Sequence, residues 1–168
     1  MTQKIFWQNP YLTELSTTVT SVQGNKITVK ETIFYAFSGG QESDYGSICN
    51  YPVLEAKKEG KKIFYTLDEN HLLKVGGTVK MIIDWERRYK LMRLHFAAEV
   101  VLELICQQFL DIVKIGAHIA SDKARIDFSW HENLAPYLPS VQQAAQNIID
   151  ADQEIISAFS DGINERRY

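Results

Sequence analysis

The stretch IDWERRYKLMRLHFAAE, residues 83–99, marks the point where the pattern of the chain changes. Before it come short alternating runs rich in β-branched and aromatic residues, such as KITVKETIFYAF (26–37) and TVKMIIDW (78–85). Glycine-containing turn signals separate these runs. Alternation with such turns predicts about six strands, which we expect to form a small β-barrel ending near Asp84.

After Asp84 the apolar residues recur at intervals of three and four, which predicts one long helix running to about Val113. The segment KIGAHIASDKARIDFSW (114–130) then predicts a β-hairpin that turns at residues 121–123. A second helix is expected over SVQQAAQNIIDAD (140–152), with Ser140 and Gln143 as a capping box. The sequence further predicts a short strand at EIISAF (154–159) and the start of a helix after it.

This order of elements predicts an α+β protein with two parts. Residues 1–84 would form the N-terminal β-barrel, and residues 85–168 an α/β two-layer domain. The sheet of the second part is short of strands. We therefore expect either a truncation at the C-terminus or completion of the layer by another element.

The bulk composition is that of a globular protein, with 45% hydrophobic and 23% charged residues among 168. The absence of a signal peptide and of an apolar run of about 18 residues predicts a cytoplasmic protein without a membrane anchor. Two cysteines do not make a disulfide framework, so reduced thiols are expected. A net charge of −3 argues against indiscriminate nucleic-acid binding, DNA included, but permits a local basic patch.

The predicted long helix carries two features that suggest chemistry. The first is a basic run that is either a solvated helix face or a set of phosphate contacts, made of Arg87, Arg88, Lys90 and Arg93. The second is the pair His95 and Glu99, which lie four apart and so share one helix face. By spacing alone this pair is either a surface hydrogen-bonded pair or two ligands of a zinc ion.

Other zinc ligands are hard to supply from the sequence. Cys106 lies eleven residues beyond His95, about 16 Å along a helix, and is too distant. His118 lies in an alternating strand, where a structural histidine is expected, and His131 lies in a polar loop.

Two motifs in this order resemble the alanyl-tRNA editing family of the AlaX type. TIFYAFSGGQESDYGSI (32–48) is similar to the family pattern T-x-F-Y-P-x-G-G-G-Q-x-x-D-x-G-x-I. IDWERRYKLMRLHFAAE (83–99) is similar to I-D-W-x-R-R-x-x-x-M-R-x-H-T-A-x-H, and GAHIASDKARIDF (116–128) gives a weaker third match. The family includes the editing domain of alanyl-tRNA synthetase, which also resembles the second additional domain of threonyl-tRNA synthetase.

The resemblance implies a trans-editing hydrolase that removes serine or glycine from mischarged tRNA for alanine, by metal-assisted ester hydrolysis. It implies that His95 and Glu99 hold zinc and act in catalysis, with Glu99 as a ligand or as general base. The other implied site residues are Thr32, Gly39, Gly40 and Gln41 at the substrate, and Arg87, Arg88 and Arg93 at the tRNA acceptor end, with Arg166 and Arg167 adding positive charge at the tail.

Departures from the family pattern qualify this prediction. Ala36 replaces a proline, Ser38 the first glycine of a triplet, and Glu99 the second histidine of H-x-x-x-H. The family's later C-x-x-x-H pair has no counterpart before Tyr168, so the third and fourth zinc ligands are not visible in the chain. We therefore expect weak or no activity from the 168 residues. The alternatives are a non-catalytic tRNA- or synthetase-binding module with a degenerate metal site, or a protein that binds a free amino acid or nucleotide.

Overall fold

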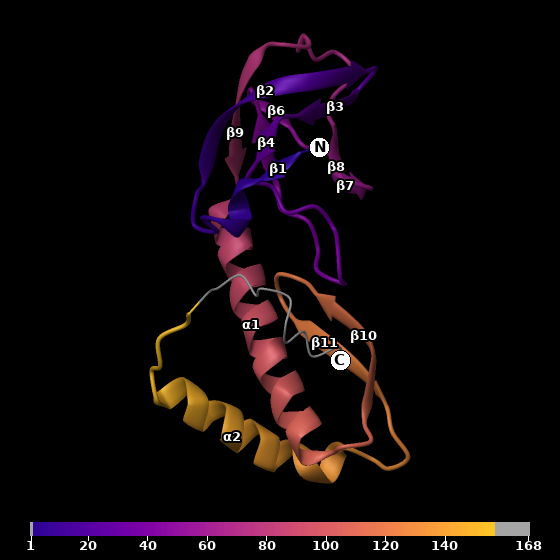
Figure 1. Ribbon diagram of the computed structural model, residues 1–168, viewed down its shortest axis with the longest axis vertical. Coiled ribbons are helices and arrows are strands. Elements are labelled where there is room, and N and C mark those ends of the chain that lie inside the picture. Colours follow the sequence, from indigo (N-terminus) through magenta and orange to yellow (C-terminus); the bar gives the residue numbers. More distant parts are fainter. Residues whose placement is uncertain (1, 157–168) are drawn as a thin grey trace.

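The computed structural model describes residues 2–156 and shows an elongated molecule with a curled sheet at one end and a long helix leaving it (Figure 1). The strands of the N-terminal part are β1 (Gln3–Lys4), β2 (Glu14–Gln23), β3 (Lys26–Val29), β4 (Glu31–Thr32), β5 (Gly46–Ile48), β6 (Tyr51–Pro52), β7 (Glu55–Glu59), β8 (Lys62–Thr66) and β9 (Thr78–Ile83). The remaining elements are the 3-10 helix η1 (Ile5–Trp7), α1 (Trp85–Gln108), β10 (Val113–Ile119), β11 (Ala124–Ser129), the 3-10 helix η2 (Ala135–Tyr137) and α2 (Leu138–Asp150).

Seven of the strands form one antiparallel sheet in the order β6-β5-β9-β2-β3-β8-β7. The long strand β2 holds it together, because its first half pairs with β9 and its second half with β3. A register shift between Val19 and Ser21 separates the two halves, and such a bulge bends a strand and increases its twist. The mixed α and β architecture that the sequence predicts is confirmed. Closure of the sheet into a barrel is not confirmed, because no pairing among the described residues joins β6 to β7.

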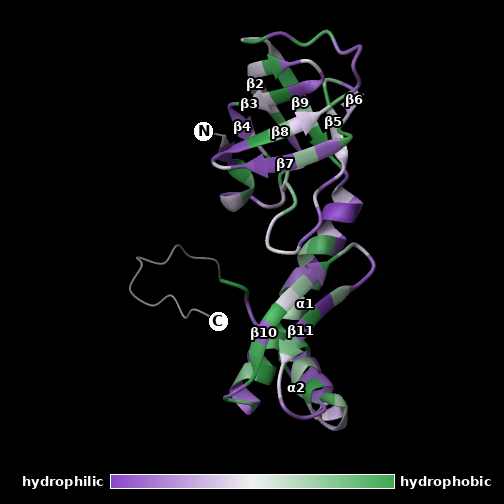
Figure 2. Cartoon of the chain, turned by 90° about the vertical axis from the view of Figure 1, so that its right-hand side faces the viewer, coloured by the Kyte–Doolittle hydropathy of each residue, from purple (hydrophilic) through white to green (hydrophobic). Residues whose placement is uncertain are grey.

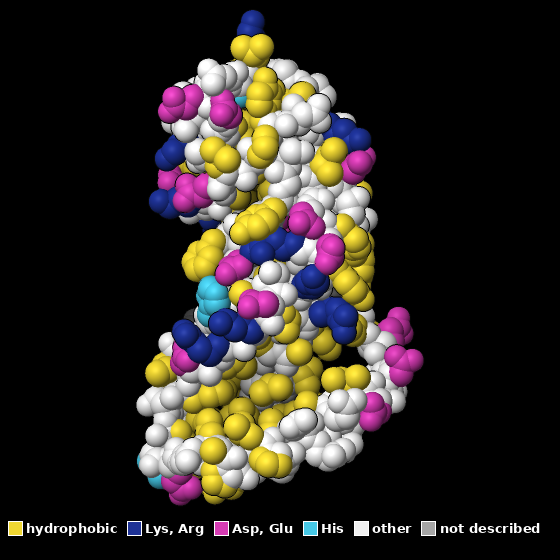
Figure 3. All heavy atoms as spheres, turned by 180° about the vertical axis from the view of Figure 1, so that it is seen from behind, with side chains coloured by type: hydrophobic (Ala, Val, Ile, Leu, Met, Phe, Trp, Pro, Cys, Tyr) yellow, Lys and Arg dark blue, Asp and Glu magenta, His cyan; other side chains and the backbone are white. Residues whose placement is uncertain are grey.

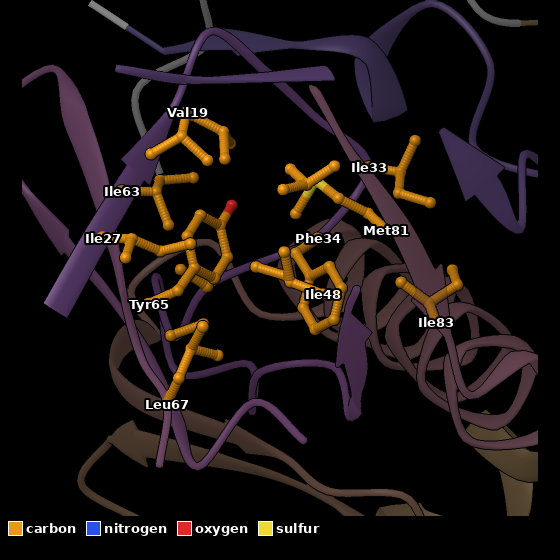
Figure 4. Close-up of a cluster of buried hydrophobic side chains, with 14 residues drawn as sticks. Val19, Ile27, Ile33, Phe34, Ile48, Ile63, Tyr65, Leu67, Met81 and Ile83 are labelled. Atoms are coloured by element: carbon orange, nitrogen blue, oxygen red, sulfur yellow. The ribbon is translucent and has the colours of Figure 1, made fainter. Parts of the chain in front are cut away.

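The core of the curled sheet is a cluster of buried aliphatic and aromatic side chains (Figure 4). Tyr65 projects from β8 toward the middle of the cluster, where its ring makes an edge contact with Phe34 at 5.6 Å between centroids. Buried alternate residues of β2, β8 and β9 supply most of the rest, as expected for strands with one face toward a core, and β3 buries three consecutive residues. The alternating pattern in the sequence therefore reports this burial correctly.

Helix α1 begins where the sequence predicts, because Asp84 caps it. The Asp84 carboxylate accepts a hydrogen bond from the Arg87 amide at 3.1 Å, which satisfies one of the free N–H groups of the first turn. The end of the helix was predicted wrongly. Phe109 is already extended, so α1 ends at Gln108, and Val113 opens β10 instead of closing the helix.

The C-terminal half packs the β10–β11 hairpin and α2 against α1 (Figures 1 and 2). Two clusters join them, one around Leu91, Ala98 and Ile119 and the other around Ile105, Ile112 and Val141. The hairpin turns at the predicted residues. A two-layer domain is not confirmed by this arrangement, and the division at residue 84 into two domains stays a prediction.

Two finer predictions fail in this half. The capping box is wrong, because α2 starts at Leu138 and the Ser140 hydroxyl donates back to the Tyr137 carbonyl at 2.8 Å. The strand predicted at 154–159 is absent from residues 154–156, and its remainder lies outside the described residues, as do Arg166, Arg167 and the final predicted helix. Neither helix in the described range is long and apolar enough to cross a bilayer.

A buried ion pair joins α1 to the sheet. The Arg88 side chain is 4% exposed and Asp44 is fully buried, and the guanidinium binds both carboxylate oxygens of Asp44. Arg88 also donates to the carbonyls of Ile33 and Pro10, and Asp44 accepts from the Tyr35 amide at 2.6 Å. Each buried charge is thus paired and hydrogen-bonded, as burial requires.

Replacing Arg88 with alanine should leave the Asp44 carboxylate buried without its charged partner. We expect Arg88→Ala to lower the free energy of unfolding by about 3–5 kcal/mol, measured by urea denaturation. The matched control is Lys90→Ala, which removes an exposed pair with Glu86 at 2.7 Å and should cost about 0.5 kcal/mol or less. Equal losses in the two variants would contradict the assigned role of Arg88.

Candidate functional site

The glycine turn at residues 38–41 forms the centre of the candidate site. Ser38 and Gln41 exchange two backbone hydrogen bonds, of 3.3 and 3.1 Å. Gly39 and Gly40 between them have φ angles of +59° and +82°, the left-handed pair that a tight two-residue hairpin turn needs. Glycine adopts these angles without steric cost, so the sequence Gly-Gly determines the turn locally.

The turn docks on the backbone of β10. The Ile119 amide donates to the Gly40 carbonyl at 2.9 Å, and the Glu42 amide donates to the Ile119 carbonyl at 3.0 Å. A Cβ on Gly40 would lie 2.1 Å from the carbonyl oxygen of Ala117, so only glycine permits this approach. These contacts bring the end of the sheet region against the hairpin.

Docking places Gln41 beside His95 on α1. Gln41 is 5% exposed, and its carbonyl oxygen Oε1 lies 2.5 Å from Nδ1 of His95. A carbonyl oxygen only accepts hydrogen bonds, so the imidazole carries its proton on Nδ1. In the neutral ring the other nitrogen, Nε2, is left as an acceptor or a metal ligand.

Nε2 of His95 faces Glu99 one helical turn away. The distance from Nε2 to Glu99 Oε1 is 3.6 Å, with side chains 40% and 51% exposed. Lys114 of β10 approaches the same carboxylate at 4.0 Å. Glu99 also borders an open groove of about 310 Å³ between α1 and α2, lined by Glu99, Val100, Glu103, Leu104, Gln107 and Ile148.

The pair His95 and Glu99 fits part of a zinc site. Two ligands of one tetrahedral zinc, with bonds of about 2.0–2.1 Å, lie roughly 3.3 Å apart, close to the observed separation. Within residues 2–156, however, no three His, Cys, Asp or Glu side chains gather into a metal-binding group. A catalytic zinc usually has three protein ligands, so the described residues account for only two of them.

A second polar cluster lies beside the turn and was not predicted. Glu42 Oε2 forms an ion pair with Arg87 Nη2 at 2.6 Å, and Glu42 Oε1 lies 3.3 Å from Nε2 of His118. Arg87 donates further to the carbonyl of Ser43 and the hydroxyl of Ser121, and its guanidinium lies 3.9 Å from the Tyr45 ring centroid. No sequence pattern marks Glu42 or Lys114, since single charged residues in a loop or a strand are usually solvated.

The predicted phosphate-binding arginines separate into three environments. Arg88 is buried against Asp44 and cannot reach a phosphate, so its predicted role in nucleic-acid binding is corrected. Arg87 is 12% exposed and is committed to the Glu42 cluster. Arg93 is exposed, and its guanidinium lies 5.7 Å from the Tyr89 ring centroid. Figure 3 shows charged side chains of both signs gathered around the middle of the molecule, above a broad hydrophobic area.

Thr32 is not at the surface of this site. It is fully buried, and its hydroxyl pairs with the Tyr65 hydroxyl at 2.6 Å while accepting from the Phe34 amide at 3.0 Å. Burial raises the pKa of Tyr65 well above its usual range, so its hydroxyl stays protonated. The prediction that Thr32 faces the substrate is corrected, because both partners of its hydroxyl belong to the core of the sheet.

The docked turn therefore brings the glycine motif (32–48) and the helix motif (83–99) together in one place. The chain is 32% identical to the alanyl-tRNA editing protein AlaX-M of Pyrococcus horikoshii, over 92% of this chain and 73% of the relative. It is 32% identical to AlaX-M of Saccharolobus solfataricus, over 92% of this chain and 67% of the relative. The alanine–tRNA ligase of Ignicoccus hospitalis is 33% identical over 98% of this chain, which spans 18% of that ligase.

No protein-family model matches the chain. The identity to AlaX-M nevertheless extends over most of both proteins. The chain therefore belongs to the AlaX-type family of alanyl-tRNA editing proteins, and the resemblance seen in the sequence is confirmed.

Gly40→Ala should undo the docking of the turn on β10, because the added Cβ meets the Ala117 carbonyl and the backbone φ is left-handed. We expect amide hydrogen exchange at Ile119, whose N–H bonds to Gly40, to be faster by about tenfold or more. Gly39→Ala is the control, because it has the same backbone strain but nothing within 4 Å of its Cβ. Equal exchange at Ile119 in both variants would contradict the docking role of Gly40.

Proposed function

We propose that the protein is a trans-editing hydrolase that deacylates tRNA for alanine mischarged with serine or glycine. The names of its relatives support a role in alanyl-tRNA editing, with tRNA as substrate. The contact that carries the proposal is the one from Gln41 to His95, because it turns Nε2 toward Glu99 at the meeting point of both family motifs. A cytoplasmic location is part of the proposal.

In this mechanism Gln41 positions the imidazole, a role different from the substrate contact that the sequence predicts for it. Its amide accepts from Nδ1, which fixes the tautomer and the orientation of the ring. Gly39 is exposed at the tip of the turn with open space around it, and so remains a candidate contact for the aminoacyl group or the terminal adenosine. Gly40 holds the turn in place.

Glu99 is the proposed general base. A water molecule attacks the ester carbonyl carbon as its proton passes to the Glu99 carboxylate. The tetrahedral intermediate then collapses, the ester C–O bond breaks, and the ribose oxygen takes up the proton that Glu99 accepted, which restores the carboxylate. The exposed carboxylate and the groove beside it leave room for both water and the acyl group.

Zinc is the proposed cofactor. His95 Nε2 and one Glu99 oxygen would hold it, which leaves the other Glu99 oxygen to accept the proton of the water. The described residues supply no third ligand. When bound, zinc polarises an ester carbonyl and lowers the pKa of water. Lys114 adds a positive charge 4.0 Å from Glu99, which would offset negative charge developing nearby.

A non-catalytic module that binds tRNA or a synthetase is the second candidate. The observation that favours it is the two-donor set at His95 and Glu99, where a catalytic zinc usually has three protein ligands. Such a module would retain the fold and the exposed Arg93 without turnover.

Deacylation of seryl-tRNA for alanine by the full chain distinguishes the two candidates. We expect weak ester hydrolysis that exceeds the spontaneous rate, is lost on chelation of zinc, and falls to the spontaneous rate in His95→Ala. His131→Ala is the matched control, because His131 is 64% exposed and is paired with Asp111 and Glu132 away from the turn.

Two results would contradict the editing mechanism. Hydrolysis by His95→Ala at the rate of the unaltered protein would show that the imidazole takes no part in the reaction. Hydrolysis at the spontaneous rate by the unaltered chain, with tRNA still bound, would instead establish the binding module.

A further inference from the structure

A row of aromatic rings runs along the first turns of α1, on a face that the proposed chemistry does not use. The Trp85 and Tyr89 rings stack at 5.6 Å between centroids with planes 28° apart. The Tyr11 ring extends the row from the loop before β2, 5.7 Å from Trp85, and the Arg93 guanidinium closes it, 5.7 Å from Tyr89. We call Tyr11, Trp85, Tyr89 and Arg93 the aromatic row.

The row is not part of the core. Residues four apart on a helix share a face, which places Trp85, Tyr89 and Arg93 together. The buried face of α1 instead carries Arg88, Leu91, Ala98, Leu102 and Ile105. Tyr11 is 61% exposed and Tyr89 43%, so their rings present apolar surface to water.

Within residues 2–156, no carboxylate forms an ion pair with the positive charge of the row. Arg93 forms no ion pair with any residue of the described chain, whereas Lys90 is bound by Glu86 at 2.7 Å. Arg87 and Arg88 are committed to Glu42 and Asp44. Of the four cations in the basic run, Arg93 is therefore the one that no carboxylate of residues 2–156 pairs with.

We infer that the aromatic row is a stacking platform for an unpaired nucleotide of the RNA substrate, with Arg93 at a neighbouring phosphate. Every base has a π face that stacks on exposed aromatic rings, and a cation at the end of the row attracts the RNA backbone. The rings are already held against one another in the protein, so few side-chain rotations have to be fixed when a base binds. The inference rests on the proposed function, which makes RNA the substrate.

The position of the row agrees with this assignment. Tyr89 precedes His95 by six residues, which is about 9 Å of rise along α1 and about 120° around it. A strand of a few nucleotides that passes around the helix would join a base on Tyr89 to an ester at His95. Single-stranded RNA is recognised through unstacked bases, which the unpaired end of an acceptor stem supplies.

The test compares Tyr89→Leu with Tyr89→Phe in binding two RNA hairpins of identical stem, one with an unpaired 3′ end and one blunt. Fluorescence anisotropy at fixed salt measures each dissociation constant. We expect Tyr89→Leu to weaken binding of the unpaired end about five- to a hundredfold, because it loses the ring, and Tyr89→Phe to match the unaltered protein. Neither variant should change binding of the blunt hairpin.

Tyr11→Leu provides a second removal of a ring at a more exposed position and should weaken binding in the same direction. Arg93→Gln should reduce the slope of log affinity against log salt by about 0.7, as expected for one phosphate of a single strand. Tyr89→Leu should leave that slope unchanged, because stacking is not ionic.

Equal binding of the unpaired end by Tyr89→Leu and Tyr89→Phe would overturn the inference, as would the same loss on the blunt hairpin. Failure of the proposed function is a separate result, seen as deacylation that does not depend on His95. A row that binds RNA without turnover would leave the platform intact and the hydrolase mechanism refuted.

Discussion

The docking of a two-residue glycine turn on a β-strand is the contact on which the site depends. Two backbone hydrogen bonds join Gly40 and Glu42 to Ile119, at 2.9 and 3.0 Å, and they leave no space for a side chain at Gly40. Because the turn belongs to the sheet region and Ile119 to the hairpin, the contact brings two separated motifs together. Gln41 then meets His95, and the imidazole is oriented before any substrate arrives.

Local signals in the sequence predicted the parts of the fold that depend on neighbouring residues. The start of α1 after Asp84, the helical spacing that follows it and the hairpin at 114–130 needed only short-range chemistry. The end of α1 was not predictable in this way. Phe109 and Ile112 continue the helical spacing and pack around Ile105, but they lie beyond the last turn of the helix. Apolar spacing predicts that a residue is buried, and here residues outside the helix are buried as well.

The sequence predicted where the site residues lie better than it predicted what each side chain does. The two motifs that marked Thr32 and Arg88 do not say whether a polar side chain faces water or the interior. Arg88 forms a buried ion pair with Asp44, and the Thr32 hydroxyl forms a hydrogen bond with Tyr65. Both side chains are therefore hydrogen-bonded inside the protein, as buried polar groups usually are. Glu42 carried no signal, since its value comes from contacts with Arg87 and His118 that are distant in sequence.

The proposed chemistry depends on Gln41, which holds the proton of His95 on Nδ1 and leaves Nε2 free. Long-range ¹H–¹⁵N NMR of the imidazole, above the pH at which the ring is protonated, reports the tautomer directly. We expect the Nδ1–H form in the unaltered protein. In Gln41→Leu we expect a shift toward the Nε2–H form, which is usual for an exposed histidine. An Nε2–H form in the unaltered protein, or no change on removing the amide, would contradict this role of Gln41.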